Sequence, residues 1–192
     1  VTGPDGTKFT YPPRRLDAFR EYVGRAAAEL APWLSAAAFI NEPNAHFHGG
    51  DRTYLAYQRA VFEEVRKAAP AVTLCGLQPG TGAHAAYVRK MLKLGGRNLV
   101  ESMDLLAVQT HPFAYMPIEK NGWDRLQADL RELAAEYGIE RIWTTEMGFE
   151  TLAPEENHMP IRTTRRTRLT ELVHTERTQA DRLTRAALYG LA

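Results

Sequence analysis

The sequence lacks several features that mark whole classes of protein. Its 192 residues include one cysteine, Cys75, which excludes an intrachain disulfide and a cysteine-rich metal site. No apolar run reaches about 18 residues, so no membrane span is expected. Lys and Arg total 24 against 23 Asp and Glu. A net charge so near zero argues against a nucleic-acid binder that relies on bulk charge.

The chain also lacks the glycine pattern of a dinucleotide site. The nearest segment, Gly76–Gly80, does not have the G-x-G-x-x-G spacing. Pro79 within it removes an N–H group that a bound phosphate would need. We therefore expect no nucleotide cofactor, and no other cofactor is indicated.

What the chain does contain is a regular alternation of strands and helices. Short apolar runs begin near Ala36, Val72, Asp104 and Arg141, at intervals of roughly 32 to 37 residues, about one βα unit each. Such alternation with short connections predicts a parallel α/β sheet. Two architectures fit at this point, a doubly wound sheet or a piece of a (β/α)8 barrel.

The helices between these runs are marked by apolar residues at helical spacing. Asp51 is a plausible N-cap of the second helix. The third helix is expected to stop at Gly95-Gly96, and Gly138 is expected to end the fourth. The predicted helices cover residues 16–30, 51–69, 84–94, 122–137 and 175–188.

Polar residues follow the strands: Glu42 the first, His111 the third and Glu146 the fourth. In parallel α/β folds this end of the sheet carries the active site. Two carboxylates at one edge of the sheet are the pair of groups that glycoside hydrolysis uses. If Glu146 points inward, alternation along the strand turns Trp143 and Thr145 toward the helices.

Three segments together resemble a known family: Phe39–Asn44, Val108–Phe113 and Ile142–Gly148. They are similar to the large clan A of retaining (β/α)8-barrel glycoside hydrolases, and most similar to its β-xylosidase and α-L-iduronidase type. There the Asn-Glu-Pro glutamate ends strand four, a His followed by aromatic residues ends strand six, and a Thr-Glu-x-Gly glutamate ends strand seven. The resemblance implies a partial TIM (β/α)8 barrel, about strands 4 to 7 with helices 3 to 7.

The resemblance also implies roles for residues at the matching positions. Glu42 would be the acid/base and Glu146 the nucleophile of a double displacement. Asn41 would bind the sugar hydroxyl next to the anomeric carbon, and His111 would line the site near the nucleophile.

One position departs from the pattern. Many members carry a Tyr two residues after the strand-six His, hydrogen-bonded to the nucleophile, but this chain has Phe113, which has no hydroxyl. Tyr115 could replace it from the same loop. A non-catalytic carbohydrate-binding remnant is the alternative that this departure favours.

Two further clusters have competing interpretations. His46 and His48 form an H-x-H pair, which metal-dependent barrel hydrolases use on a strand, but here it lies in a loop without an obvious third ligand. We expect His46 to contact substrate and no metal to bind. An arginine cluster fits a solvated loop or the recognition of an acidic sugar; it comprises Arg162, Arg165, Arg166 and Arg168.

The length completes these expectations. Eight βα units need roughly 250 residues, so we expect residues 1–192 to be a single partial barrel domain, with loops at 1–10 and 151–174. Two open sheet edges would invite pairing or aggregation. The expected partner is an oligosaccharide, polysaccharide or glycoside, with neither nucleic acid nor membrane. Oligomeric state and localisation are left open.

Overall fold

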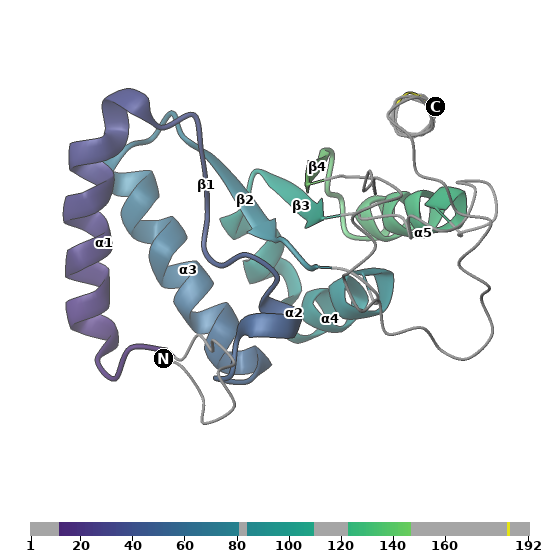
Figure 1. Cartoon of the computed structure of the whole chain (residues 1–192), viewed down its shortest axis with the longest axis horizontal. Coiled ribbons are helices and arrows are strands. Elements are labelled where there is room, and N and C mark those ends of the chain that lie inside the picture. Colours follow the sequence, from purple (N-terminus) through teal and green to yellow (C-terminus); the bar gives the residue numbers. More distant parts are fainter. Residues whose placement is uncertain (1–11, 81–83, 110–122, 147–183, 185–192) are drawn as a thin grey trace, which may run out of the picture. The chain divides into compact units, whose positions relative to one another are not determined.

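The computed structural model describes residues 12–80, 84–109, 123–146 and 184 (Figure 1). The helices are α1 (Leu16–Leu30), α2 (Pro43–His46), α3 (Asp51–Ala68), α4 (His84–Ser102) and α5 (Trp123–Glu136), with a 3-10 turn η1 (Ala31–Trp33). The strands are β1 (Ala36–Ala38), β2 (Thr73–Leu77), β3 (Leu105–Gln109) and β4 (Ile142–Glu146).

The chain divides into two compact units. The first contains Val1–Thr110 and Ala128–Glu146, and the second contains His111–Gln127 and Met147–Ala192. All four strands belong to the first unit. Of the second unit, only residues 123–127 and Thr184 are described.

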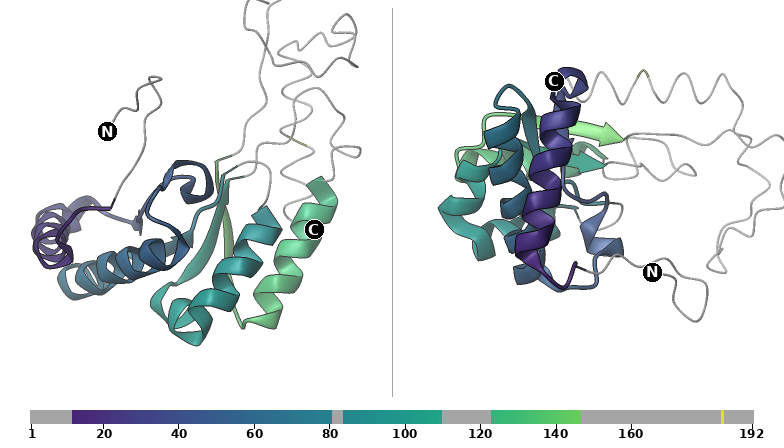
Figure 2. Two further views of the ribbon diagram at one scale, coloured as in Figure 1. Left: turned by 90° about the horizontal axis from the view of Figure 1, so that it is seen from below. Right: turned by 90° about the vertical axis from the view of Figure 1, so that its left-hand side faces the viewer.

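The four strands form one parallel sheet in the order β1-β2-β3-β4, which confirms the predicted parallel α/β sheet. The register pairs Ala36 with Thr73 and Cys75 with Leu105. Right-handed crossovers between successive neighbouring strands place the connecting helices on the same face of a sheet. Figure 2 shows α3 and α4 on one side of it, with α1 beside α3. The described strands show no reversal of order of the kind that marks a doubly wound sheet.

The core lies between the two central strands and the helices. Every residue of β3 is buried, and α3 buries a stripe at helical spacing. The largest fully buried side chains include Tyr54, Phe62, Leu74, Leu77, Met91, Leu92, Leu105, Leu106, Leu130 and Leu133. Cys75 is buried among them, and burial, followed by the charge of Asp104, raises the pKa of its thiol. The edge strands are more open, since Trp143 on β4 is 43% exposed.

Two predicted helix ends differ from the structure. Asp51 is the first residue of α3 rather than its cap, and Gly50 (φ 78°) precedes it. Gly96 (φ 56°) interrupts α4 where the helix was expected to stop, but helical turns resume and continue to Ser102. Gly138 (φ 69°) follows α5 as predicted, and the N–H of Ile139 donates to Ala134 O at 2.8 Å.

The amino ends of the central strands are held by a charged cluster. Arg66 on α3 donates two hydrogen bonds of 2.7 Å to the carboxylate of Asp104. That carboxylate also accepts the N–H of Leu74 at 2.7 Å. Burial raises the pKa of Asp104, but these hydrogen bonds outweigh it and hold the pKa below its usual value. The cluster stabilises the sheet at the edge opposite to the candidate carboxylates.

No helix within residues 12–80, 84–109 and 123–146 is long and apolar enough to cross a membrane.

Candidate functional site

Glu42 lies in a tight turn that follows β1, with three residues between the strand and Glu42. Its backbone is left-handed (φ 47°, ψ 56°), which is uncommon for a residue other than glycine. Its carbonyl accepts the N–H groups of Ala45 and His46, each at 2.9 Å, and its own N–H donates to Gln78 O at 3.2 Å. Pro43 occupies the first position of α2, where a missing N–H leaves no partner unsatisfied. The turn is therefore fixed both to α2 and to the end of β2.

The carboxylate of Glu42 is partly enclosed. Its side chain is 21% exposed, and Oε2 lies 3.1 Å from Nε2 of His46, which is itself 51% exposed. On another side it packs against Gly80: a Cβ atom added there would come closer than 3.0 Å to Cγ, Cδ and Oε1 of Glu42. Asn44 fixes the Gly80 backbone by accepting its N–H at 2.7 Å. The sequence contained no signal for the roles of Gly80 and Asn44.

Glu146 ends β4 beside a β-bulge. Thr144 pairs with Val108, but the next pair is Glu146 with Gln109, so Thr145 is the extra residue. The hydroxyl of Thr145 donates to Val108 O at 3.1 Å and accepts Nε2 of Gln78 at 3.3 Å. The bulge interrupts the strict alternation on which the predicted orientation of Thr145 depends. Thr145 is hydrogen-bonded to Gln78, which follows β2, and Glu146 is hydrogen-bonded to Gln109, the last residue of β3.

Gln109 links the two motifs. Its Nε2 donates to Oε1 of Glu146 at 3.0 Å and also to Oδ1 of Asn41. Asn41 immediately precedes Glu42, so one amide connects the end of β4 with the turn after β1. Gln109 is fully buried. Gln109 belongs to the Val108–Phe113 segment, but nothing in the sequence indicates this bridging position.

A second strained turn supports the first. Leu77 and Gln78, at the end of β2, have φ values of 68° and 39°. The N–H of Leu77 donates to Oε1 of Gln58 at 3.1 Å, and its carbonyl accepts the hydroxyl of Tyr54 at 3.3 Å. Tyr54 also donates to Oε1 of Gln58 at 2.7 Å. Two buried side chains of α3 therefore hold the turn whose next carbonyl, that of Gln78, binds the N–H of Glu42.

The structure brings together four of the six predicted site residues. Glu42 and His46 are hydrogen-bonded, and Asn41 and Glu146 share Gln109. The predicted His111 and Tyr115 lie outside the described residues, as do Phe113 and the arginine cluster, so their roles stay predictions. Among residues 12–80, 84–109 and 123–146, no three His, Cys, Asp or Glu side chains gather as a metal site requires.

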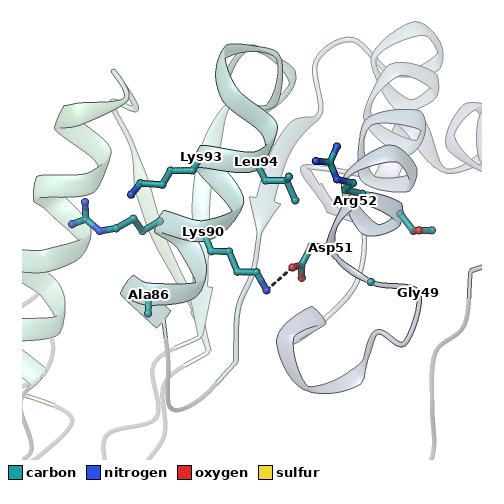
Figure 3. Close-up of a pocket in the computed structure, with 10 residues that line it drawn as sticks. Gly49, Asp51, Arg52, Ala86, Lys90, Lys93 and Leu94 are labelled. Atoms are coloured by element: carbon teal, nitrogen blue, oxygen red, sulfur yellow. Dashed lines mark ion pairs between the residues drawn. The ribbon is translucent and has the colours of Figure 1, made fainter.

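A cavity of about 910 Å³ lies elsewhere, between the first turns of α3 and α4 (Figure 3). Asp51 on α3 forms an ion pair with Lys90 on α4 across it. Basic side chains and short apolar ones form most of the remaining wall, and Asp51 is the only carboxylate among the described residues that line it. A paired-carboxylate reaction needs two, so we place the candidate site at the carboxyl ends of the strands instead.

No protein-family model matches this sequence, and no curated protein matches it either. Solved structures do resemble it. A glucosidase from Croceicoccus marinus aligns with a TM-score of 0.57 at 16% identity over 74% of this chain and 32% of its own. A family 39 glycoside hydrolase from Bacteroides cellulosilyticus WH2 aligns with a TM-score of 0.59 at 20% identity over 94% of this chain and 36% of its own. A fungal β-1,4-galactanase aligns with a TM-score of 0.57 at 13% identity over 77% of this chain and 49% of its own.

This chain therefore spans about a third to a half of the length of the structures that it resembles. At these identities the likeness concerns the fold. The chain has an α/β fold with a four-stranded parallel sheet, and it is similar to part of the fold of glycoside hydrolases.

Proposed function

We propose that this chain forms part of a (β/α)8 barrel, about strands 4 to 7, and belongs to a retaining glycoside hydrolase. The observation that carries the proposal is the Gln109 bridge: it joins Glu146 to the residue before Glu42, although the two glutamates are 104 residues apart. The consecutive order of parallel strands supports the barrel. The likeness to three glycoside hydrolases supports the class of activity.

In this proposal the two carboxylates divide the chemistry of a double displacement. Glu42, as a carboxylic acid, protonates the glycosidic oxygen while an oxygen of Glu146 bonds to the anomeric carbon, and the bond to the leaving group breaks. The Glu42 carboxylate then takes a proton from water, whose oxygen displaces Glu146 and releases the sugar.

The test compares Glu146→Ala with Glu140→Ala, which alters an exposed glutamate just before β4. Aryl glycosides are screened first for a substrate of the purified protein that contains the whole barrel. Glu146→Ala is expected to abolish hydrolysis, with turnover restored by azide acting as a replacement nucleophile, whereas Glu140→Ala keeps wild-type rates. Wild-type turnover in Glu146→Ala would refute the assignment.

The same experiment separates the rival function, a carbohydrate-binding remnant without turnover. The observation that favours the rival is Phe113, which lacks the hydroxyl expected beside the nucleophile. A remnant would bind sugars in calorimetry and hydrolyse none of the aryl glycosides.

A further inference from the structure

We infer that Gln109 is the positioning residue that sets the attacking geometry of Glu146 and couples it to the Asn41–Glu42 segment. This inference rests on the proposed function and adds a residue to it. It starts from a polar side chain at the end of an otherwise apolar strand. All five residues of β3 are buried, and Gln109 is 0% exposed. A buried amide is costly unless it is hydrogen-bonded, so its partners define what it does.

The partners lie on both sides of β3. A glutamine amide carries two N–H donors on one planar nitrogen. In this structure the nitrogen serves Oε1 of Glu146 and Oδ1 of Asn41. Because the two N–H bonds diverge at a fixed angle, the amide fixes the distance between these two oxygen atoms. Neither oxygen can shift without breaking its hydrogen bond to a donor that water does not reach.

The bulge in β4 makes this arrangement possible. Paired residues of neighbouring strands direct their side chains to the same face. With a regular register, Thr145 would pair with Gln109; the bulge moves Glu146 into that place. The bulge and the amide therefore work together, one aligning the carboxylate with β3 and the other holding its oxygen.

The chemistry of the amide suits a nucleophile. A neutral donor orients a carboxylate oxygen and leaves the negative charge of the carboxylate in place. Lys or Arg at the same place would add a positive charge next to the carboxylate, which reduces its nucleophilic strength. Glutamate would place a second negative charge within hydrogen-bond distance, which repels Glu146. Among long polar side chains, glutamine combines the reach with an uncharged donor.

The test uses Gln109→Leu, which keeps the bulk and removes the donors, and Gln109→Glu, which keeps the shape. We expect kcat for an aryl glycoside to fall about 10- to 100-fold in Gln109→Leu, as loss of a hydrogen bond to a charged group predicts, with KM nearly unchanged. In Gln109→Glu we expect a larger fall in kcat, because the new carboxylate repels Glu146. Trapping by a 2-fluoro glycoside, which labels the nucleophile without turnover, should slow by the same factor.

The matched control is Gln127→Leu, which removes another buried glutamine, on α5, a helix that carries none of the candidate site residues. The melting temperature of both leucine variants is measured, and only Gln109→Leu should slow nucleophile trapping to this extent. Equal effects of the two variants on trapping, or none from Gln109→Leu, would overturn the positioning role. If Glu146→Ala retains hydrolysis, or the wild type hydrolyses no glycoside, the proposed function falls and the inference falls with it.

Discussion

Gly80→Ala is a small change that should act on Glu42 alone. The new methyl group would come closer than 3.0 Å to three atoms of the Glu42 side chain. Gly80 does not have a left-handed backbone, so alanine can adopt its conformation without strain. Asn44 holds the Gly80 backbone through the 2.7 Å hydrogen bond, so the clash must be relieved mainly by movement of the carboxyl group.

The size of the effect follows from that movement. Ordinary contact begins near 3.4 Å, and the carboxyl group must retreat by roughly 1 Å to reach a favourable separation. A misplacement of this size costs about 100-fold in rate for a group that acts at the reacting centre. A factor of 100 corresponds to about 2.7 kcal/mol in the activation free energy. Stability should change much less, because the Glu42 side chain can adopt another rotamer toward solvent.

The assay compares aryl glycosides with good and poor leaving groups. Because the proposed role of Glu42 is to protonate the leaving oxygen, a displaced Glu42 should harm poor leaving groups most. We expect kcat/KM for a phenyl glycoside to fall about 100-fold and that for a dinitrophenyl glycoside to fall far less. The control is Gly24→Ala in α1, whose new Cβ would lie 3.6 Å from the nearest atom, an ordinary contact.

Two results would refute the reasoning in different ways. A loss of equal size for both leaving groups would mean that the methyl group disturbs binding or the nucleophile rather than an acid. Wild-type rates with both substrates would mean that Glu42 in this position takes no part in the reaction.

Two further predictions concern stability. Tyr54→Phe removes the hydroxyl that donates to Gln58 and to Leu77 O; we expect the free energy of unfolding to fall by about 1–3 kcal/mol in urea titrations, because buried acceptors lose a donor. Asp104→Asn breaks the charged pair with Arg66 and should cost about 1 kcal/mol at pH 7. The pKa of Asp104 lies below its ordinary value of 3.8, so its stabilising effect is present above that value and is lost as pH falls through the lowered pKa. The difference in stability between the two proteins should therefore disappear once the pH lies below the lowered pKa of Asp104.

Each of these two substitutions has a control in which the same residue type is changed at an exposed position. Tyr22 is 64% exposed, and Tyr22→Phe should leave the urea midpoint unchanged. Asp17, paired with Arg15 at the surface, is 68% exposed, and Asp17→Asn should also have no measurable effect. An Asp104→Asn variant that stays less stable than wild type at low pH would show that packing, not charge, explains its loss.

The elements that the sequence predicted well are those with long periodic signals. The apolar stripe of α3 and the apolar run of β3 arise because several residues of each element are buried. The sequence pattern therefore predicts both elements. The four-residue helix α2 was not predicted, because one turn is too short to show any periodicity. The Gly95-Gly96 interruption of α4 was recognised, but the return to helix as far as Ser102 depends on packing: Met103, the next residue, lies against Gly76 of β2.

The candidate site also contains residues that the sequence predicted and one that it did not. Glu42 and Glu146 were proposed because residues at the carboxyl ends of parallel strands meet at one edge, a rule of topology that needs only the order of elements. Gln109 was not proposed, because its contacts depend on a single extra residue in β4. A bulge changes which residue stands opposite Gln109, and nothing in the local sequence distinguishes Thr145 as that extra residue.

Backbone strain gives an independent reason to place function at this edge. Three residues other than glycine have left-handed φ values in the described ranges, and all three follow β1 or lie at the end of β2: Glu42, Leu77 and Gln78. Each such residue costs of order 1 kcal/mol or more, and persists only where its surroundings hold it. Here α3 holds Leu77 through two buried side chains, and Gln78 in turn binds Glu42. Because a relaxed loop could connect the same strands at lower cost, strain concentrated beside one of the two candidate carboxylates argues that the position of Glu42, rather than the connection itself, is what this part of the fold maintains.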